Sequence, residues 1–244
     1  MGPQIVSKAV TLVWTNLGAA IRATAVPFGL MAAMPVLFLQ GPVPGEAPLQ
    51  PGHVLVAVLS FLLFAWGSSA WHRYVLLEEL PAPLPRPGGA AFIEYLWASI
   101  RTGAFTLAII VLAILAISLL AGAFGSLLGA VGGGGVFPLV FGGVVLIAYV
   151  GLRVSLVLPA AALGRRMSLR QSWQATRPAW NAVLVAGLLV AGLQAVLAFV
   201  AEALAGVPLL GLVVVVVLNW VSVMIGLSIL TALYGVLVEG RTVD

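Results

Sequence analysis

The chain has 244 residues, of which 62% are hydrophobic and only 7% are charged, whereas soluble globular proteins carry about 25% charged residues. A soluble domain cannot bury this much apolar surface, and the absence of cysteine excludes disulfides, thiolate metal sites and a cysteine nucleophile. A net charge of +4 suits nucleic acid or an anionic membrane surface. In a chain this apolar it favours the membrane, so we expect no nucleic-acid partner.

Six stretches are long enough to span a membrane, for which about 20 apolar residues are needed. In chain order they cover residues 24–40, 53–77, 102–130, 136–162, 182–204 and 207–238. Short turns rich in glycine or proline join the two members of each pair. The sequence therefore predicts an all-α membrane protein with six transmembrane helices arranged as three hairpins.

The basic residues all fall on one side of this arrangement. They precede the first span, lie at the end of the fourth, follow the sixth or occupy the two long connections between hairpins. They are Lys8, Arg22, Arg73, Arg86, Arg101, Arg153, Arg165, Arg166, Arg170, Arg177 and Arg241. The connections within the hairpins contain no Lys or Arg. The positive-inside rule then predicts that both termini and the long connections lie in the cytoplasm.

A short amphipathic stretch precedes each hairpin. Apolar faces at helical spacing are formed by Val6, Val10, Val13, Leu17 and Ala20, by Phe92, Leu96 and Ile100, and by Leu169, Trp173, Thr176, Trp180 and Leu184. Ser168 and Gln171 have the spacing of a capping box, which predicts a helix start. We expect one membrane domain, residues 1–244, of three repeats (about 4–80, 90–165 and 168–240). In each repeat an amphipathic helix in the cytoplasmic headgroup layer precedes an outward and a return span.

Arg153 is the main polar residue predicted inside the hydrocarbon, where such groups are costly and often functional. It lies twelve residues before Arg165, about 18 Å along a helix. Its guanidinium would form an anion or headgroup site, or pair with a carboxylate such as Glu78. A third interpretation is snorkelling to the interface, if the span ends near Pro159.

Two further sets of residues within the spans indicate helix packing. Gln194 and Asn219 lie near the middle of adjacent spans, where an interhelical hydrogen bond of about 1 kcal/mol or a substrate site would explain them. Gly125, Gly129 and Gly133 recur every four residues, a spacing that lets helix backbones approach closely. This glycine contact is predicted to be internal, with a partner helix as the alternative.

Motifs of the common membrane and phosphate-binding enzymes are missing from the sequence. It contains no H-E-x-x-H, no G-x-S-x-G and no P-loop. His53 and His72 lie at span ends, and aromatic residues flank His72, so we expect interfacial anchors rather than ligands. We therefore predict no enzymatic activity, no cofactor and no metal site.

The segment 152–184 resembles a segment of the YciC-like bacterial inner-membrane proteins, and of the membrane domain that accompanies some glycerophosphodiester phosphodiesterases. The residues that carry the resemblance are Pro159, Ala160, Ser168, Ser172, Trp173, Trp180 and Asn181. The resemblance implies a six-span, multi-pass protein of the bacterial cytoplasmic (inner) membrane. It implies no catalytic residue, and the soluble phosphodiesterase domain is not part of this sequence, so hydrolysis is not carried over.

Residues 165–177, named here the basic connector, are the predicted contact for anionic headgroups or a partner protein. The candidate contacts are Arg165, Arg166, Arg170, Arg177, Trp173 and Trp180. Each basic residue contributes about 1 kcal/mol near an anionic surface, although the same arginines would also serve merely to fix topology. The predicted function is an accessory or organising subunit that packs against a larger membrane complex or specific lipids. The alternative is a transporter or lipid carrier that uses the bundle interior near Arg153.

Overall fold

The computed structural model describes residues 2–38, 51–80, 89–130 and 137–242, which form helices and turns without a strand among them. The helices are α1 (Gly2–Thr15), α2 (Leu17–Phe38), α3 (Pro51–Leu77), α4 (Ala90–Ala130), α5 (Phe137–Val154), α6 (Val157–Ala162), α7 (Leu169–Ala175), the 3₁₀ turn η2 (Arg177–Ala179), α8 (Trp180–Ala203) and α9 (Pro208–Leu237). Apart from its end turns, a helix pairs its backbone groups internally, as a membrane requires of a span.

Six segments are long and apolar enough to cross a membrane, as the sequence predicts. They are α2, α3, α4, the combined α5 and α6, α8 and α9. Pro51 and Pro208 stand at the starts of α3 and α9, where a missing backbone N–H leaves no helical hydrogen bond unmade. The predicted capping box is also present, because Ser168 and Gln171 exchange hydrogen bonds at the start of α7.

The fourth span is not the continuous helix predicted for residues 136–162. It breaks at Ser155 and Leu156, between α5 and α6. Pro159 cannot donate a hydrogen bond to the carbonyl of Ser155, four residues earlier, and that carbonyl instead accepts from Leu158 N at 3.0 Å. The break lies just after Arg153.

The amphipathic stretches also differ from their predicted form. The second is not a separate helix, because α4 runs without interruption from Ala90 to Ala130. In the first, the buried residues of α1 include Ile5, Ala9 and Val13, whereas Val6 and Val10 are half-buried. Helical periodicity locates an apolar stripe to within one residue, and contact with neighbouring helices then selects the buried side.

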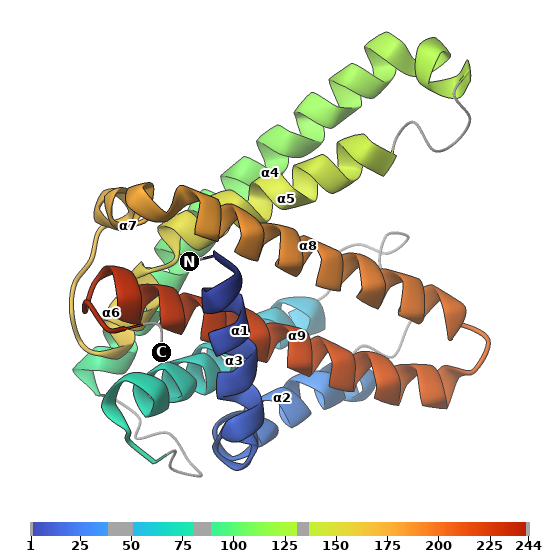
Figure 1. Ribbon diagram of the computed structural model, residues 1–244. Coiled ribbons are helices and arrows are strands. Elements are labelled where there is room, and N and C mark those ends of the chain that lie inside the picture. Colours follow the sequence, from blue (N-terminus) through green and yellow to red (C-terminus); the bar gives the residue numbers. More distant parts are fainter. Residues whose placement is uncertain (1, 39–50, 81–88, 131–136, 243–244) are drawn as a thin grey trace.

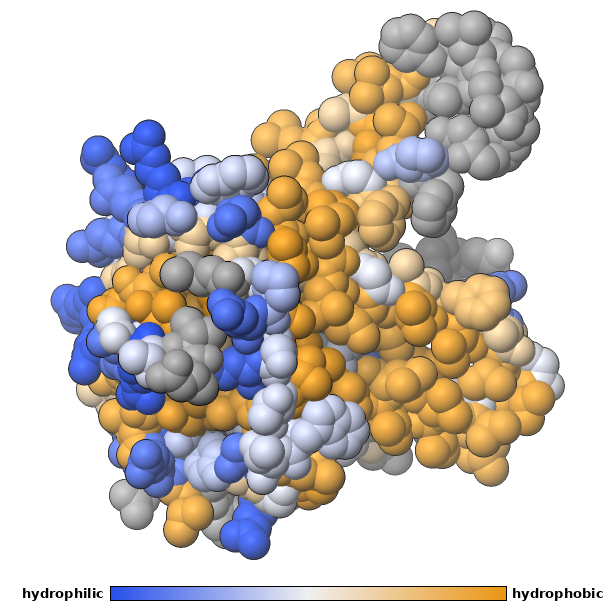
Figure 2. Space-filling view, in the orientation of Figure 1, coloured by the Kyte–Doolittle hydropathy of each residue, from blue (hydrophilic) through white to orange (hydrophobic). Residues whose placement is uncertain are grey.

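Figure 1 shows the spans meeting at one end and separating toward the other. α1, α6 and α7 lie at the end where the spans meet, here called the polar end. Hydrophilic residues gather there in Figure 2, and apolar residues cover most of the remaining coloured surface in this view. The largest buried cluster joins α1, α3, α5, α6, α8 and α9. The core therefore sits at the polar end, and the outer half of the α4–α5 pair projects away from the other spans (Figure 1).

Close contact between α5 and α8 depends on Gly187. A Cβ atom there would lie 3.2 Å from the backbone nitrogen of Tyr149 and 3.4 Å from its Cα, which is tighter than ordinary packing. Small residues allow such approach between membrane helices, where association relies on van der Waals contact. The contact fixes the turn of α5 that carries Tyr149 and Arg153.

Candidate functional site

A groove opens at the polar end between α4 and the basic connector. It is largely open, has a volume of about 430 Å³ and is lined by Glu94, Trp97, Arg101, Arg166, Met167, Ser168 and Gln171. The first three residues come from α4, and the others belong to the basic connector. We name this feature the α4 groove. Its volume falls in the range of small-molecule sites, about 300–1,000 Å³.

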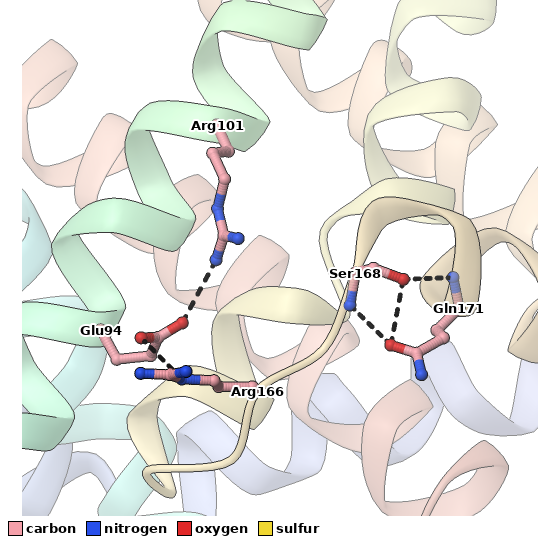
Figure 3. Close-up of polar contacts among 5 residues, drawn as sticks. All are labelled: Glu94, Arg101, Arg166, Ser168 and Gln171. Atoms are coloured by element: carbon pink, nitrogen blue, oxygen red, sulfur yellow. Dashed lines mark hydrogen bonds and ion pairs between the residues drawn. The ribbon is translucent and has the colours of Figure 1, made fainter.

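Glu94 lies between two arginines in the α4 groove. Arg101 donates from Nη2 to its Oε1 at 3.3 Å, and Arg166 Nε lies 3.6 Å from its Oε2. Figure 3 shows Arg101 reaching the carboxylate along α4 and Arg166 reaching it from the basic connector. Both distances exceed the roughly 2.7–2.9 Å of a strong charge-assisted hydrogen bond. The arginines therefore keep donors free for a second acceptor.

Ser168 and Gln171 form the wall of the groove nearest α7. Gln171 Oε1 accepts from the backbone nitrogen of Ser168 at 2.8 Å and from its hydroxyl at 3.0 Å. The same hydroxyl accepts from Gln171 N at 3.2 Å. These hydrogen bonds, drawn in Figure 3, fix the start of α7 and hold this part of the basic connector in one shape.

The four arginines of the basic connector occupy different environments. Arg165 pairs with Glu239, which follows α9, at 3.0 Å, and Arg166 lies beside Glu94. Tyr234, and then Glu239, raise the pKa of Arg165 above its usual value, so this guanidinium stays charged. Arg170 and Arg177 are exposed, and no carboxylate of the described residues lies within ion-pair distance of either.

Arg153 joins α5 to α7. Its Nε donates to Thr176 Oγ1 at 3.1 Å, its Nη1 to the Tyr149 hydroxyl at 3.2 Å and its Nη2 to the Trp173 carbonyl at 2.9 Å. The guanidinium also lies over the Trp173 ring, 3.9 Å from its centroid, as in a cation–π contact. Arg153 is 7% exposed, and among the described residues no carboxylate, Glu78 included, pairs with it.

Ser172 closes the break between α5 and α6, a role that sequence reasoning missed. Its hydroxyl donates to the Arg153 carbonyl at 2.7 Å and accepts from Leu156 N at 3.2 Å. These are backbone groups that the interrupted helix leaves without helical partners. Ser172 is fully buried. The third amphipathic stretch thus buries Ser172 and, from its predicted apolar face, Thr176. Trp173 and Trp180 of that face are exposed instead, at 38% and 55%.

His72 is fully buried rather than an interfacial anchor. Its Nδ1 lies 2.8 Å from Thr231 Oγ1, and Thr231 donates its own hydrogen to the Leu227 carbonyl, so His72 Nδ1 is the donor in this pair. Its Nε2 and the hydroxyl of Ser68 are buried without a partner in the described part of the chain. Ser68 and His72 lie one helical turn apart in the sequence, and this spacing could have indicated that they and Thr231 form a buried polar cluster.

Gln194 and Asn219 do not form the predicted bond with each other in the structure. Gln194 Nε2 donates to Ser222 Oγ at 3.3 Å, across α8 and α9. Both Gln194 and Asn219 are exposed, and the described residues offer the Asn219 carboxamide no partner. Of the predicted glycine contact, Gly133 lies outside the described residues, and Gly125 and Gly129 lie in α4 within a segment described by its backbone alone.

Comparison with known proteins supplies no relative. No protein family, curated protein or solved structure matches this chain, so the resemblance of residues 152–184 remains a prediction. Within the described residues, no group of three His, Asp or Glu side chains is placed to hold a metal ion.

Proposed function

We propose that this chain is a non-enzymatic polytopic membrane protein that acts as an accessory subunit, packing its α8–α9 face against a transmembrane helix of a larger complex. The observation that carries the proposal is the exposure of Asn219 and Gln194. Asn219 lies eleven residues after the start of α9 at Pro208, about 16 Å along the helix. That distance is half of a hydrocarbon core about 30 Å thick.

An unpaired carboxamide at this depth is costly, because lipid chains offer it no hydrogen bond. A partner helix carrying a hydroxyl or carboxamide would satisfy Asn219, and such interhelical bonds contribute about 1 kcal/mol each. Ser222 lies one turn along α9 from Asn219 and already bonds Gln194. The side chains of Gln194, Asn219 and Ser222 thus form a polar site that can fix the register of a partner helix packed on this otherwise apolar surface.

In the proposed arrangement, the spans form three hairpins, each entered through an amphipathic segment at the cytoplasmic surface of a bacterial inner membrane. Both termini lie in the cytoplasm. The basic residues support this orientation, and the exposed Arg170 and Arg177 supply attraction to anionic headgroups. Trp173 and Trp180, both exposed, suit the membrane–water interface.

A carrier that works through Arg153 would need its guanidinium free to meet a ligand. In the structure that group donates to three protein acceptors, stacks on Trp173 and is 7% exposed. These contacts favour a positioning role for Arg153 and make the accessory subunit the better-supported proposal.

The test uses the absence of native cysteine. A photoreactive maleimide is attached to single cysteines at Asn219→Cys or, as a control, Leu107→Cys, which is 60% exposed on α4. In the protein's own membranes, we expect position 219 to crosslink to one defined membrane protein and position 107 to give no such product. In parallel, Asn219→Leu should reduce recovery of that protein in mild detergent, whereas Val216→Leu, an exposed site on the same helix, should not.

Two results would count against the accessory role. One is a lipid-only crosslink pattern at position 219, since the site would then face hydrocarbon. The other is a crosslink to a second copy of this chain, which would replace the accessory role with a homo-oligomer.

A further inference from the structure

The α4 groove combines both signs of charge with a path into the membrane. Two guanidinium groups, those of Arg101 and Arg166, share the carboxylate of Glu94. The arginine side chains are 51% and 90% exposed, and that of Glu94 is 22% exposed. The cations therefore face outward, with the carboxylate set deeper between them.

An exposed apolar stripe leaves this groove along α4. Trp97 lines the groove, and exposed residues follow on the same side at alternating spacings of three and four: Ile100, Ala104, Leu107, Val111 and Ile114. Such spacing marks one face of a helix. The most apolar part of α4, within residues 90–120, contains no buried residue. A molecule with a charged head in the groove can thus lay hydrocarbon chains along α4.

The charges of the groove determine which headgroup it can bind. Each guanidinium carries five N–H donors in a planar fork, and the long contacts to Glu94 leave donors available for phosphate oxygens. A phosphate alone would meet the carboxylate of Glu94 at close range and be repelled. An ammonium group a few ångströms from the phosphate removes this repulsion by pairing with Glu94.

We propose that the α4 groove binds the headgroup of an amine-bearing phospholipid of the phosphatidylethanolamine type. Arg101 and Arg166 hold the phosphate, Glu94 accepts hydrogen bonds from the ammonium, and the acyl chains lie along the stripe that begins at Trp97. This inference rests on the proposed placement of the polar end at the lipid surface and does not depend on the α8–α9 partner.

The experiment measures lipid retention by the full chain in native mass spectrometry after detergent stripping and re-addition of equimolar phosphatidylethanolamine and phosphatidylglycerol with identical acyl chains. We expect the wild-type chain to retain phosphatidylethanolamine preferentially. Glu94→Gln should lower that retention about fivefold, the effect of one charge contact near the membrane, without lowering retention of phosphatidylglycerol. Arg101→Gln with Arg166→Gln should lower both, whereas Arg22→Gln, an exposed site on α2 outside the groove, should leave retention of phosphatidylethanolamine unchanged.

Equal retention of the two lipids by the wild-type chain would overturn the inference, as would an unchanged preference in Glu94→Gln. If Glu94→Gln fails to fold, the wild-type chain still decides, because phosphatidylcholine has a quaternary amine that cannot donate a hydrogen bond. Retention of phosphatidylcholine equal to that of phosphatidylethanolamine contradicts the proposed role of Glu94.

Two further measurements distinguish a lipid headgroup from a free phosphate ester, and distinguish failure of this inference from failure of the proposed accessory role. Free phosphoethanolamine, which lacks acyl chains, should not displace the lipid at equal concentration; if it does, the ligand is a soluble phosphate ester and the lipid assignment is wrong. Crosslinking at position 219 is measured on the same variants. Absence of lipid selectivity in the wild-type chain, with that crosslink intact, would overturn this inference alone.

Discussion

Arg153 is a buried cation whose partners are all neutral. A hydroxyl, a phenol and a carbonyl accept its hydrogen bonds, and the Trp173 ring covers one face of the guanidinium. This arrangement depends on the planar fork of arginine, which reaches several acceptors at fixed angles and stacks on aromatic rings. Lysine carries the same charge on a single nitrogen and cannot reproduce these contacts.

Arg153→Lys should therefore lower the free energy of unfolding by about 2 kcal/mol, the scale of hydrogen bonds from a charged group. The measurement is thermal unfolding in detergent, followed by tryptophan fluorescence, with Arg170→Lys on the exposed surface of α7 as the matched control. An Arg153→Lys chain as stable as the wild type would mean that charge alone is required at this position, and would restore the case for a ligand site there.

At the scale of the element, the broken fourth span is completed by a side chain from another helix. Ser172 of α7 supplies the donor and the acceptor that the chain lacks between α5 and α6. Its hydroxyl is buried, so its removal leaves two backbone groups without partners, and neither gains water in exchange. Each such group costs about 1–3 kcal/mol.

Ser172→Ala should destabilise this junction and expose the amide of Leu156. We expect faster hydrogen exchange in the segment 152–163 and a loss of about 2 kcal/mol in unfolding free energy. Ser168→Ala is the comparison, because it removes the cap of α7, worth about 1 kcal/mol, without touching Leu156. Unchanged exchange in the Ser172→Ala chain would show that the bridge contributes nothing.

Some of these elements can be predicted from the sequence, and others cannot. Hydropathy locates the six spans because a continuous apolar run is a local property, and the capping box is equally local. The break at Ser155 is not local, since Pro159 interrupts the helix only where Ser172 can satisfy the freed groups. The candidate site shows the same limit. The contact between Glu94 and Arg166 depends on how the basic connector folds against α4.

At the scale of the whole molecule, packing and charge are concentrated at one end. The buried clusters join the ends of the spans to α1 and α6, and ion pairs tie the basic connector to α4 and to the segment after α9. Away from this end, large apolar side chains on α4 and α9 are exposed. A membrane would cover those surfaces, so the fold has to be considered together with its orientation in the bilayer.

The basic residues predict that the polar end faces the cytoplasm, and this orientation can be tested directly. Gln174 is exposed on α7, and Ala205 is exposed between α8 and α9. Each is replaced by cysteine, Gln174→Cys or Ala205→Cys, in a chain without other thiols. A membrane-impermeant maleimide should label position 205 in intact spheroplasts and position 174 only after permeabilisation. The physical reason is that arginine-rich connections are retained on the side where the chain is made. The opposite labelling pattern would place the α4 groove outside the cytoplasm and contradict the proposed positive-inside topology. Labelling of both positions in intact cells would mean that the bundle adopts two orientations.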